Sequence, residues 1–260
     1  MTQRERREYL IHYLLKEKQG LLPQHVPKAE EKQRELLRSL MNVRMPEPIS
    51  EEFRKIQDDY LTERNKERGV TLADSLHPVP SDSRLYVWQG DITTLQCDAI
   101  VNACNSQMLG CFSPMHACID NVIHTYAGIQ LRLTMHEIMQ KQGHEEETGK
   151  AKITPGYNLP AKYILHSVGP IVQWEVTKQD EELLASCYRE CLTLAAEHGV
   201  ESIAFCCLST GVFRFPKQRA AEIAIATVEE FLAGNEQIKQ VIFNVFQEED
   251  VRIYTALLNG

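Results

Sequence analysis

The sequence predicts an α/β protein with a largely parallel central sheet, preceded by a helical segment. From residue 84 onward, short apolar runs that end in Gly or Asn turns alternate with helical patterns. This alternation is typical of strands and crossover helices. Residues 1–80 are helical in pattern and carry a net charge of +1, whereas residues 81–260 carry −9. The shift predicts an N-terminal helical extension (1–80) and a main domain (81–260).

The extension is expected to contain three helices, at 4–18, 28–41 and 50–68. Apolar residues recur at helical spacing in the first two. Ser50, followed by two glutamates, is typical of a helix N-terminus, and Gly69 marks the expected end of the third helix. We interpret the extension as a cap packed on the main domain, with an independent binding module as the alternative.

The main domain is expected to alternate strands with helices. Strands are predicted at 84–89, 99–103, 163–168, 203–208 and 241–245, with a further one at 151–154. Helices are predicted at 119–126, 129–142, 181–198, 218–232 and 248–258. Ligands of such sheets bind beyond the C-terminal ends of the strands, so the loops that follow the strands are the candidate site.

Composition limits the classes of partner. The net charge of −8 offers no overall field for nucleic acid. The sequence has no run of about twenty apolar residues, so no membrane span is predicted. The first residues lack the apolar core of a signal peptide. Cys206 and Cys207 are adjacent in an apolar run, which indicates buried free thiols and a reducing, cytoplasmic location. The oligomeric state is not predicted.

The most informative motif is a cluster of soft metal ligands. Cys111, His116 and Cys118 lie within eight residues of one another. Thiolates and an imidazole are the donor set that selects zinc. Structural zinc sites normally use four protein ligands, whereas catalytic sites leave one position open. Three ligands therefore favour a catalytic zinc site, and a purely structural zinc loop is the alternative.

Polar residues follow two of the predicted strands. Gly90 and Asp91 follow the first strand, and the Asp91 carboxylate suits an adenine amino group or a ribose hydroxyl, or the cap of a short turn. Asn102 and Asn105 come at the end of the second strand. Their amides offer a donor and an acceptor to sugar hydroxyls, or form turns.

The stretch 208–213, Leu-Ser-Thr-Gly-Val-Phe, follows a buried strand and precedes a helix. Small residues with backbone N–H groups before a helix suit a phosphate. A plain strand-to-helix turn is the alternative.

Three further titratable residues lie near the ligand cluster or in a neighbouring strand. Asp120 could hold a ribose hydroxyl, orient a water or act as general base. Its alternative role is that of an acidic residue favoured by a helix N-terminus. His124 and His166 are possible additional ligands, but we interpret them as packed histidines with satisfied hydrogen bonds.

These motifs together resemble the macrodomain family of ADP-ribose binders and hydrolases. The resemblance rests on 90–93 (Gly-Asp-Ile-Thr), 100–105 (Ile-Val-Asn-Ala-Cys-Asn), 164–170 and 208–213, and covers about residues 84–258. It implies a three-layer α/β/α fold with a mixed, largely parallel sheet. Most members carry glycines where this chain has 110–118. That departure resembles the zinc-dependent microbial macrodomains, which also carry an N-terminal helical extension.

The resemblance implies removal of mono-ADP-ribose from a protein side chain. It also implies a genetic link to a sirtuin-type ADP-ribosyltransferase and to lipoate-handling proteins, including a glycine-cleavage H-like lipoyl carrier. By the same resemblance, adenine contacts Asp91 and Ile92, the distal ribose contacts Asn105, and Zn²⁺ is held by Cys111, His116 and Cys118. The remaining implied contacts to ribose and diphosphate come from Cys118, Ile119, Asp120, Asn121, Ser209, Thr210, Gly211, Val212 and Phe213. The expected catalytic set is Asn105, Asp120, Cys111, His116 and Cys118.

The resulting hypothesis is hydrolysis of the ester between C1″ of ADP-ribose and an Asp or Glu side chain. Zinc would lower the pKa of a water or orient the ribose hydroxyls. Two rival functions are a non-catalytic ADP-ribose reader and a different zinc hydrolase that acts on a nucleotide-like small molecule.

Overall fold

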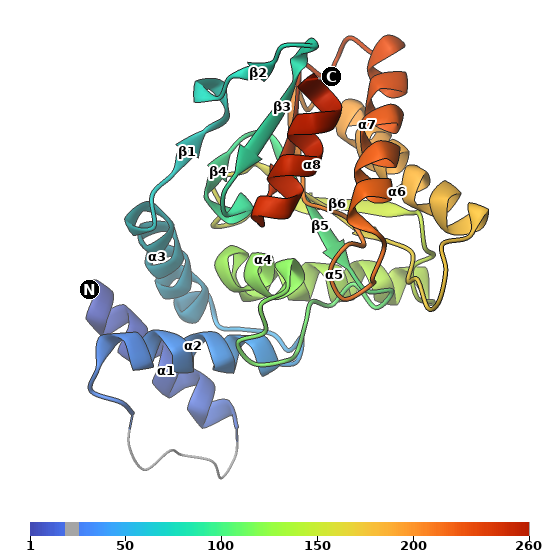
Figure 1. Ribbon diagram of the computed structural model, residues 1–260. Coiled ribbons are helices and arrows are strands. Elements are labelled where there is room, and N and C mark those ends of the chain that lie inside the picture. The colour runs from blue at the N-terminus through green and yellow to red at the C-terminus, as the bar shows by residue number, and fades with distance from the viewer. Residues whose placement is uncertain (19–25, 260) are drawn as a thin grey trace.

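A computed structural model describes residues 1–18 and 26–259 and shows a mixed sheet between two helical layers (Figure 1). The sheet strands are β2 (Pro78–Val79), β3 (Asp82–Gln89), β5 (Ala99–Cys104), β6 (Ala151–Pro155), β7 (Tyr163–Val168), β8 (Ser202–Phe205) and β9 (Gln240–Val245). Their order is β2-β3-β9-β8-β5-β7-β6. The five strands from β3 to β7 run parallel, and the edge strands β2 and β6 are antiparallel to their neighbours.

Helices cover both faces of this sheet. One layer is α4 (Ile119–Ala127) and α5 (Ile129–Gln142), which contact β5 and β6. The other is α6 (Lys178–Glu197), α7 (Lys217–Ala233) and α8 (Glu248–Asn259), which pack on one another and on β3, β6, β7 and β9. The predicted three-layer α/β/α fold is confirmed.

The central strands are mostly apolar because helices bury them from both sides. All residues of β9 are buried, and so is β5 apart from Ala103. These strands and the facing helices form one continuous apolar core. The polar ends of the parallel strands therefore gather at one edge of a rigid platform.

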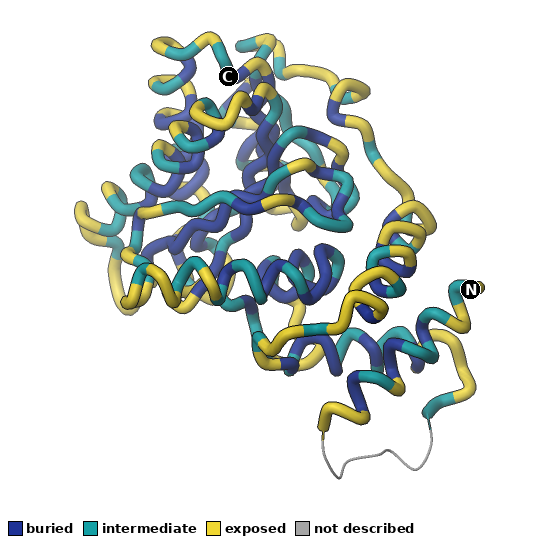
Figure 2. Tube along the Cα trace, turned by 180° about the vertical axis from the view of Figure 1, so that it is seen from behind, coloured by how far each residue is buried: buried dark blue, intermediate teal, exposed yellow. Residues whose placement is uncertain are grey.

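The N-terminal extension forms a second, smaller core. Its helices are α1 (Gln3–Glu17), α2 (Glu30–Val43) and α3 (Glu51–Glu67). Their apolar cluster includes Ile129 of α5, and α2 and α3 both contact α4. Figure 2 shows the buried faces of these helices turned toward one another and toward the main domain. The extension is thus a cap packed on the main domain rather than an isolated module.

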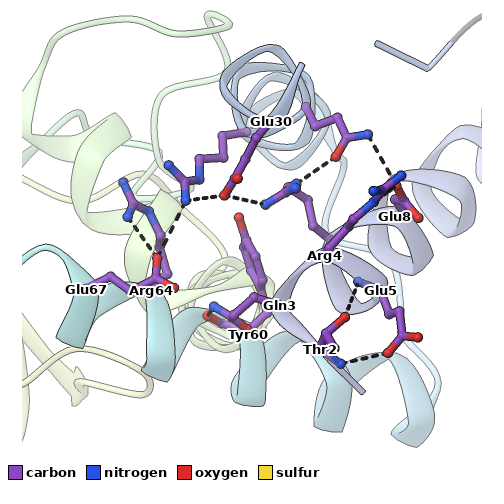
Figure 3. Close-up of polar contacts among 12 residues, drawn as sticks. Thr2, Gln3, Arg4, Glu5, Glu8, Glu30, Tyr60, Arg64 and Glu67 are labelled. Atoms are coloured by element: carbon purple, nitrogen blue, oxygen red, sulfur yellow. Dashed lines mark hydrogen bonds and ion pairs between the residues drawn. The ribbon is translucent and has the colours of Figure 1, made fainter. Parts of the chain in front are cut away.

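Polar contacts also join the three helices of the extension (Figure 3). The buried Arg7 of α1 donates to Glu30 of α2 at 3.1 Å. Gln3 donates to the backbone carbonyl of Tyr60 in α3 at 3.1 Å. Arg34 of α2 lies 3.7 Å from Glu67 of α3. These pairs fix the orientation of the helices that the apolar cluster brings together.

Most predicted boundaries agree with the structure to within about three residues. Ser50 caps α3 by accepting from the Phe53 N–H, and Gly69 follows its end with φ +87°. The strand predicted at 203–208 is wrong at its end, because β8 stops at Phe205. The following residues stay largely buried although they leave the sheet, so the apolar pattern continues past the strand.

Short elements were not predicted. The two-residue strands β1 (Thr71–Leu72) and β4 (Leu95–Gln96) pair with each other, and 3₁₀ turns form at Ala73–Ser75 and Ile92–Thr94. The boundary predicted at residue 80 falls inside the β2–β3 hairpin. Within the described ranges, no helix is both long and apolar enough to cross a membrane.

Phe53→Ala should lower the free energy of unfolding by about 3–5 kcal/mol, because it empties a fully buried position of the extension core. Urea denaturation measures the change. Leu72→Ala is the control, since this side chain is 49% exposed and should cost less than about 0.5 kcal/mol. Equal losses in the two variants would contradict the packing described here.

Candidate functional site

A cleft of about 730 Å³ opens at the C-terminal ends of the parallel strands. Its walls come from the loops after β3, β5, β8 and β9, as expected for a sheet of this type. All the residues predicted to bind ADP-ribose line it except Asn121. The expected catalytic set, including Asn105, lies on the same walls. The loops singled out in the sequence therefore converge on one site.

The three predicted metal ligands come together on one wall of the cleft. Their ligand atoms all lie within 4.8 Å of one another, and no other such group of three occurs among the described residues. The Cys111 Sγ and His116 Nδ1 atoms are 3.6 Å apart. Tetrahedral zinc, with a Zn–S bond of ~2.3 Å and a Zn–N bond of ~2.0 Å, separates such atoms by about 3.5 Å. The donor set and its spacing fit zinc.

Cys118 also begins the helix that follows the metal cluster. Its Sγ atom accepts a hydrogen bond from the Asn121 N–H, so this thiol caps α4. Burial raises the pKa of Cys118 to about 12, and the neighbouring Cys111 acts in the same direction. A bound cation displaces thiol protons, so metal binding and deprotonation are linked at this position.

The buried side chain of Asn121 lies behind the metal cluster. Its Nδ2 group donates to the backbone carbonyls of Cys111 at 3.3 Å and Ser113 at 2.9 Å. Its Oδ1 atom accepts from Arg38 of α2 at 2.8 Å. The side chain thus ties the start of the ligand loop (residues 110–118) to α4 and to the extension.

Asp120 lines the cleft and is almost fully buried. Burial raises the pKa of its carboxyl group to about 6, while the hydrogen bond from Asn102 acts in the opposite direction. That bond joins Asn102 Nδ2 to Asp120 Oδ1 at 2.8 Å. The carboxylate is therefore held in one orientation by a side chain of the central strand β5.

The two buried histidines behave differently. His166 lies 3.1 Å from Asn102 and 2.9 Å from Thr154, so its predicted hydrogen bonding is confirmed. Burial lowers the pKa of His166 to about 3. His124 is buried against Gly110 and lies 3.5 Å from Asp120, but neither ring nitrogen has a hydrogen-bond partner within the described part of the chain. Neither histidine joins the metal cluster.

Asp91 also lines the cleft. Its Oδ1 atom accepts from the Thr93 N–H at 2.9 Å, which caps the 3₁₀ turn that contains Ile92. Its Oδ2 atom pairs with Arg68, which lies 3.5 Å above the Tyr126 ring. The carboxylate therefore has both a capping role and an ion pair with the residue that ends α3.

The loop 209–213 presents backbone donors to the cleft. Ser209 adopts a left-handed φ of +62°, and Thr210 donates its hydroxyl to the Cys207 carbonyl at 3.0 Å. The backbone N–H groups of 210–213 donate to no residue that the structure describes. Unpaired N–H groups before a helix form an anion-binding nest.

Several lining residues were not predicted from the sequence. Phe246, Gln247 and Asp250 follow β9, and the rule that selected the other loops would also have selected this one. Arg38 comes from the extension, and no sequence signal connects it with the cleft.

Sequence comparison assigns the chain to a family. The sequence model of the Macro domain family matches residues 101–224. The chain therefore belongs to the macrodomain family, as the sequence motifs indicated. Its relatives include a protein-ADP-ribose hydrolase of Treponema medium, 57% identical over 100% of both chains. Another, of Staphylococcus aureus (strain MSSA476), is 48% identical over 99% of this chain and 97% of its own.

Solved structures agree with this assignment. A Trypanosoma brucei macrodomain in complex with ADP-ribose is 31% identical, with a TM-score of 0.66 over 85% of this chain and 94% of its own. An Oceanobacillus iheyensis macrodomain with ADP is 37% identical, with a TM-score of 0.61 over 70% of this chain and 92% of its own.

Gly110→Ala should lower the free energy of unfolding by at least about 1 kcal/mol, because φ is +80° at this position. The new Cβ would also lie 2.7 Å from the His124 ring. Chemical denaturation measures the effect. Gly234→Ala is the matched control, since nothing lies within 4 Å of a Cβ there. A neutral Gly110→Ala variant would show that the start of the ligand loop is not constrained as described.

Proposed function

We propose that this protein is a zinc-dependent hydrolase that removes mono-ADP-ribose from modified protein side chains. The observation that carries the proposal is the Cys111, His116 and Cys118 cluster on the wall of the cleft. The names of the Treponema and Staphylococcus relatives support the hydrolase activity. The ADP-ribose complex of the Trypanosoma macrodomain supports the ligand.

In this proposal the ligand spans the cleft from end to end. Adenine lies against Asp91 and Ile92, and the backbone N–H groups of 210–213 bind the diphosphate. Asn105 donates to the distal ribose, while the side chains of Val212 and Phe213 cover it. Binding the diphosphate far from the scissile bond holds that bond in one place, which lowers the entropic part of the barrier.

The scissile bond is proposed to be an ester between C1″ of the distal ribose and an Asp or Glu side chain. Zinc held by Cys111, His116 and Cys118 supplies Lewis acidity toward an oxygen atom of water or of the ribose. Asp120 accepts a hydrogen bond from that water or from a ribose hydroxyl. Because Asn102 fixes the Asp120 carboxylate, the acceptor is oriented before the substrate binds.

A modified protein is the proposed macromolecular partner. We include a lipoyl carrier of the glycine-cleavage H type, modified by a sirtuin-type transferase, as the partner class that the resemblance implies. The proposed location is the cytoplasm, where all eight cysteines would stay reduced, in keeping with the absence of disulfides among the described residues.

Cys111→Ala should lose bound zinc and should release ADP-ribose from an Asp- or Glu-modified protein at least ~100-fold more slowly, because a displaced reacting group costs about this much. Zinc content by metal analysis and release of free ADP-ribose are the two readouts. Cys97→Ala is the matched control, since Cys97 lies in the apolar core and outside the cleft lining.

The wild-type protein is tested in parallel with a chelator and with zinc added back. The hydrolase proposal expects release to stop and then return. Binding of the modified protein without release, in both states, would instead identify a reader. Full release by zinc-free Cys111→Ala would contradict the catalytic role of the metal.

A further inference from the structure

Arg38 of α2 reaches from the N-terminal extension into the wall of the cleft. It is the one Lys or Arg side chain among the cleft-lining residues of the described chain. Its Nη2 atom donates to the backbone carbonyl of His116 at 2.9 Å and to Asn121 Oδ1 at 2.8 Å. Its Nε atom lies 3.3 Å from the same Oδ1. One guanidinium therefore holds both a ligand residue and the amide that fixes the loop.

Asn42 repeats this contact one turn further along α2. Residues four apart lie on the same face of a helix, so both side chains point toward the ligand loop. Asn42 Oδ1 accepts from the Met115 N–H at 3.1 Å, and its Nδ2 group donates to Thr125 of α4 at 3.0 Å. Met115 has a left-handed φ of +58°, a conformation that non-glycine residues seldom adopt without support.

A buried arginine of the main domain fixes the end of α2. Arg132 of α5 donates to the carbonyls of Met41, Asn42 and Arg44, at 3.2, 2.9 and 2.6 Å. The same side chain donates to the Leu109 carbonyl at 2.7 Å, just before the ligand loop. The same Arg132 side chain therefore holds both the end of α2 and the backbone just before the loop, which fixes α2 relative to the loop.

The ligand loop has little support of its own. Residues 110–118 contain neither helix nor strand, and His116 is exposed. Metal sites depend on the groups that orient their ligands, and losing such a group typically weakens metal binding by about 10–100-fold. In this loop those groups come from Asn121 behind it and from α2 beside it.

We infer that Arg38 and Asn42 are positioning residues of the metal site, and that the N-terminal extension is part of that site rather than a separate module. The inference rests on the proposed zinc ligands. It extends the proposal by assigning the extension a role: α2 sets the backbone positions from which Cys111, His116 and Cys118 meet one ion.

The experiment measures zinc affinity by competition with a chromophoric chelator, using the full-length protein. Arg38→Ala should bind zinc about 10–100-fold more weakly than wild type. It should also shift the visible absorption of the cobalt-substituted protein, because the ligand geometry changes. Asn42→Ala should change both readouts in the same direction. In the zinc-free state, the melting temperatures of these two variants should fall no further than that of the control variant.

Arg34→Ala is the matched control. This arginine lies on the same helix, one turn before Arg38, but pairs with Glu30 and Glu67 within the extension. It should keep wild-type zinc affinity and the wild-type cobalt spectrum. Equal loss in the Arg34 variant would overturn the inference, because general loosening of the extension would then explain the effect.

Three other outcomes would also overturn it. Unchanged zinc affinity in Arg38→Ala, with wild type binding zinc, would remove the positioning role and leave the proposed metal site intact. Weaker ADP-ribose binding to zinc-free Arg38→Ala, with zinc affinity unchanged, would make Arg38 a ligand-binding residue instead. Wild-type protein that binds no zinc would overturn the metal site and this inference together.

Discussion

The hydrogen bonds of Asn121 are the constraint on which the site depends. The three candidate ligands lie in a loop without regular structure, so their side chains meet only if the loop backbone is fixed. An amide offers two donors and an acceptor in one planar group. Asn121 uses them on the Cys111 and Ser113 carbonyls and on Arg38. Because Asn121 belongs to the first turn of α4, its hydrogen bonds hold the loop against a helix that packs on the sheet.

The sheet fixes the backbone of the other loops that line the cleft. Its parallel strands end at one edge, and the loops that follow contribute different groups: a carboxylate after β3, an amide after β5, and backbone donors after β8. Asn102, inside β5, holds the Asp120 carboxylate from below. The metal cluster lies in a loop without regular structure, and it is there that α2 makes its contacts.

Sequence patterns were sufficient for the layers, the main helices and most of the cleft, because buried strands and helix faces have distinct periods. The ligand cluster was also readable, since its three members are close in sequence. Arg38 and Asn42 were not, because they lie more than seventy residues before their partners. The resemblance implied that Asn121 contacts the ligand, yet its side chain is buried and does not line the cleft. The end of β8 was missed because burial continues after the hydrogen-bond ladder stops.

We propose that Cys111, His116 and Cys118 hold one zinc ion and leave a position open toward the cleft. X-ray absorption at the zinc edge, on purified protein with ADP-ribose, tests it most directly. The spectrum should show two sulfur neighbours at ~2.3 Å and one imidazole nitrogen at ~2.0–2.1 Å, with the remaining coordination made by oxygen. A shell of four sulfur or nitrogen ligands would indicate a closed structural site, and a protein without zinc would show that these residues do not form a zinc site.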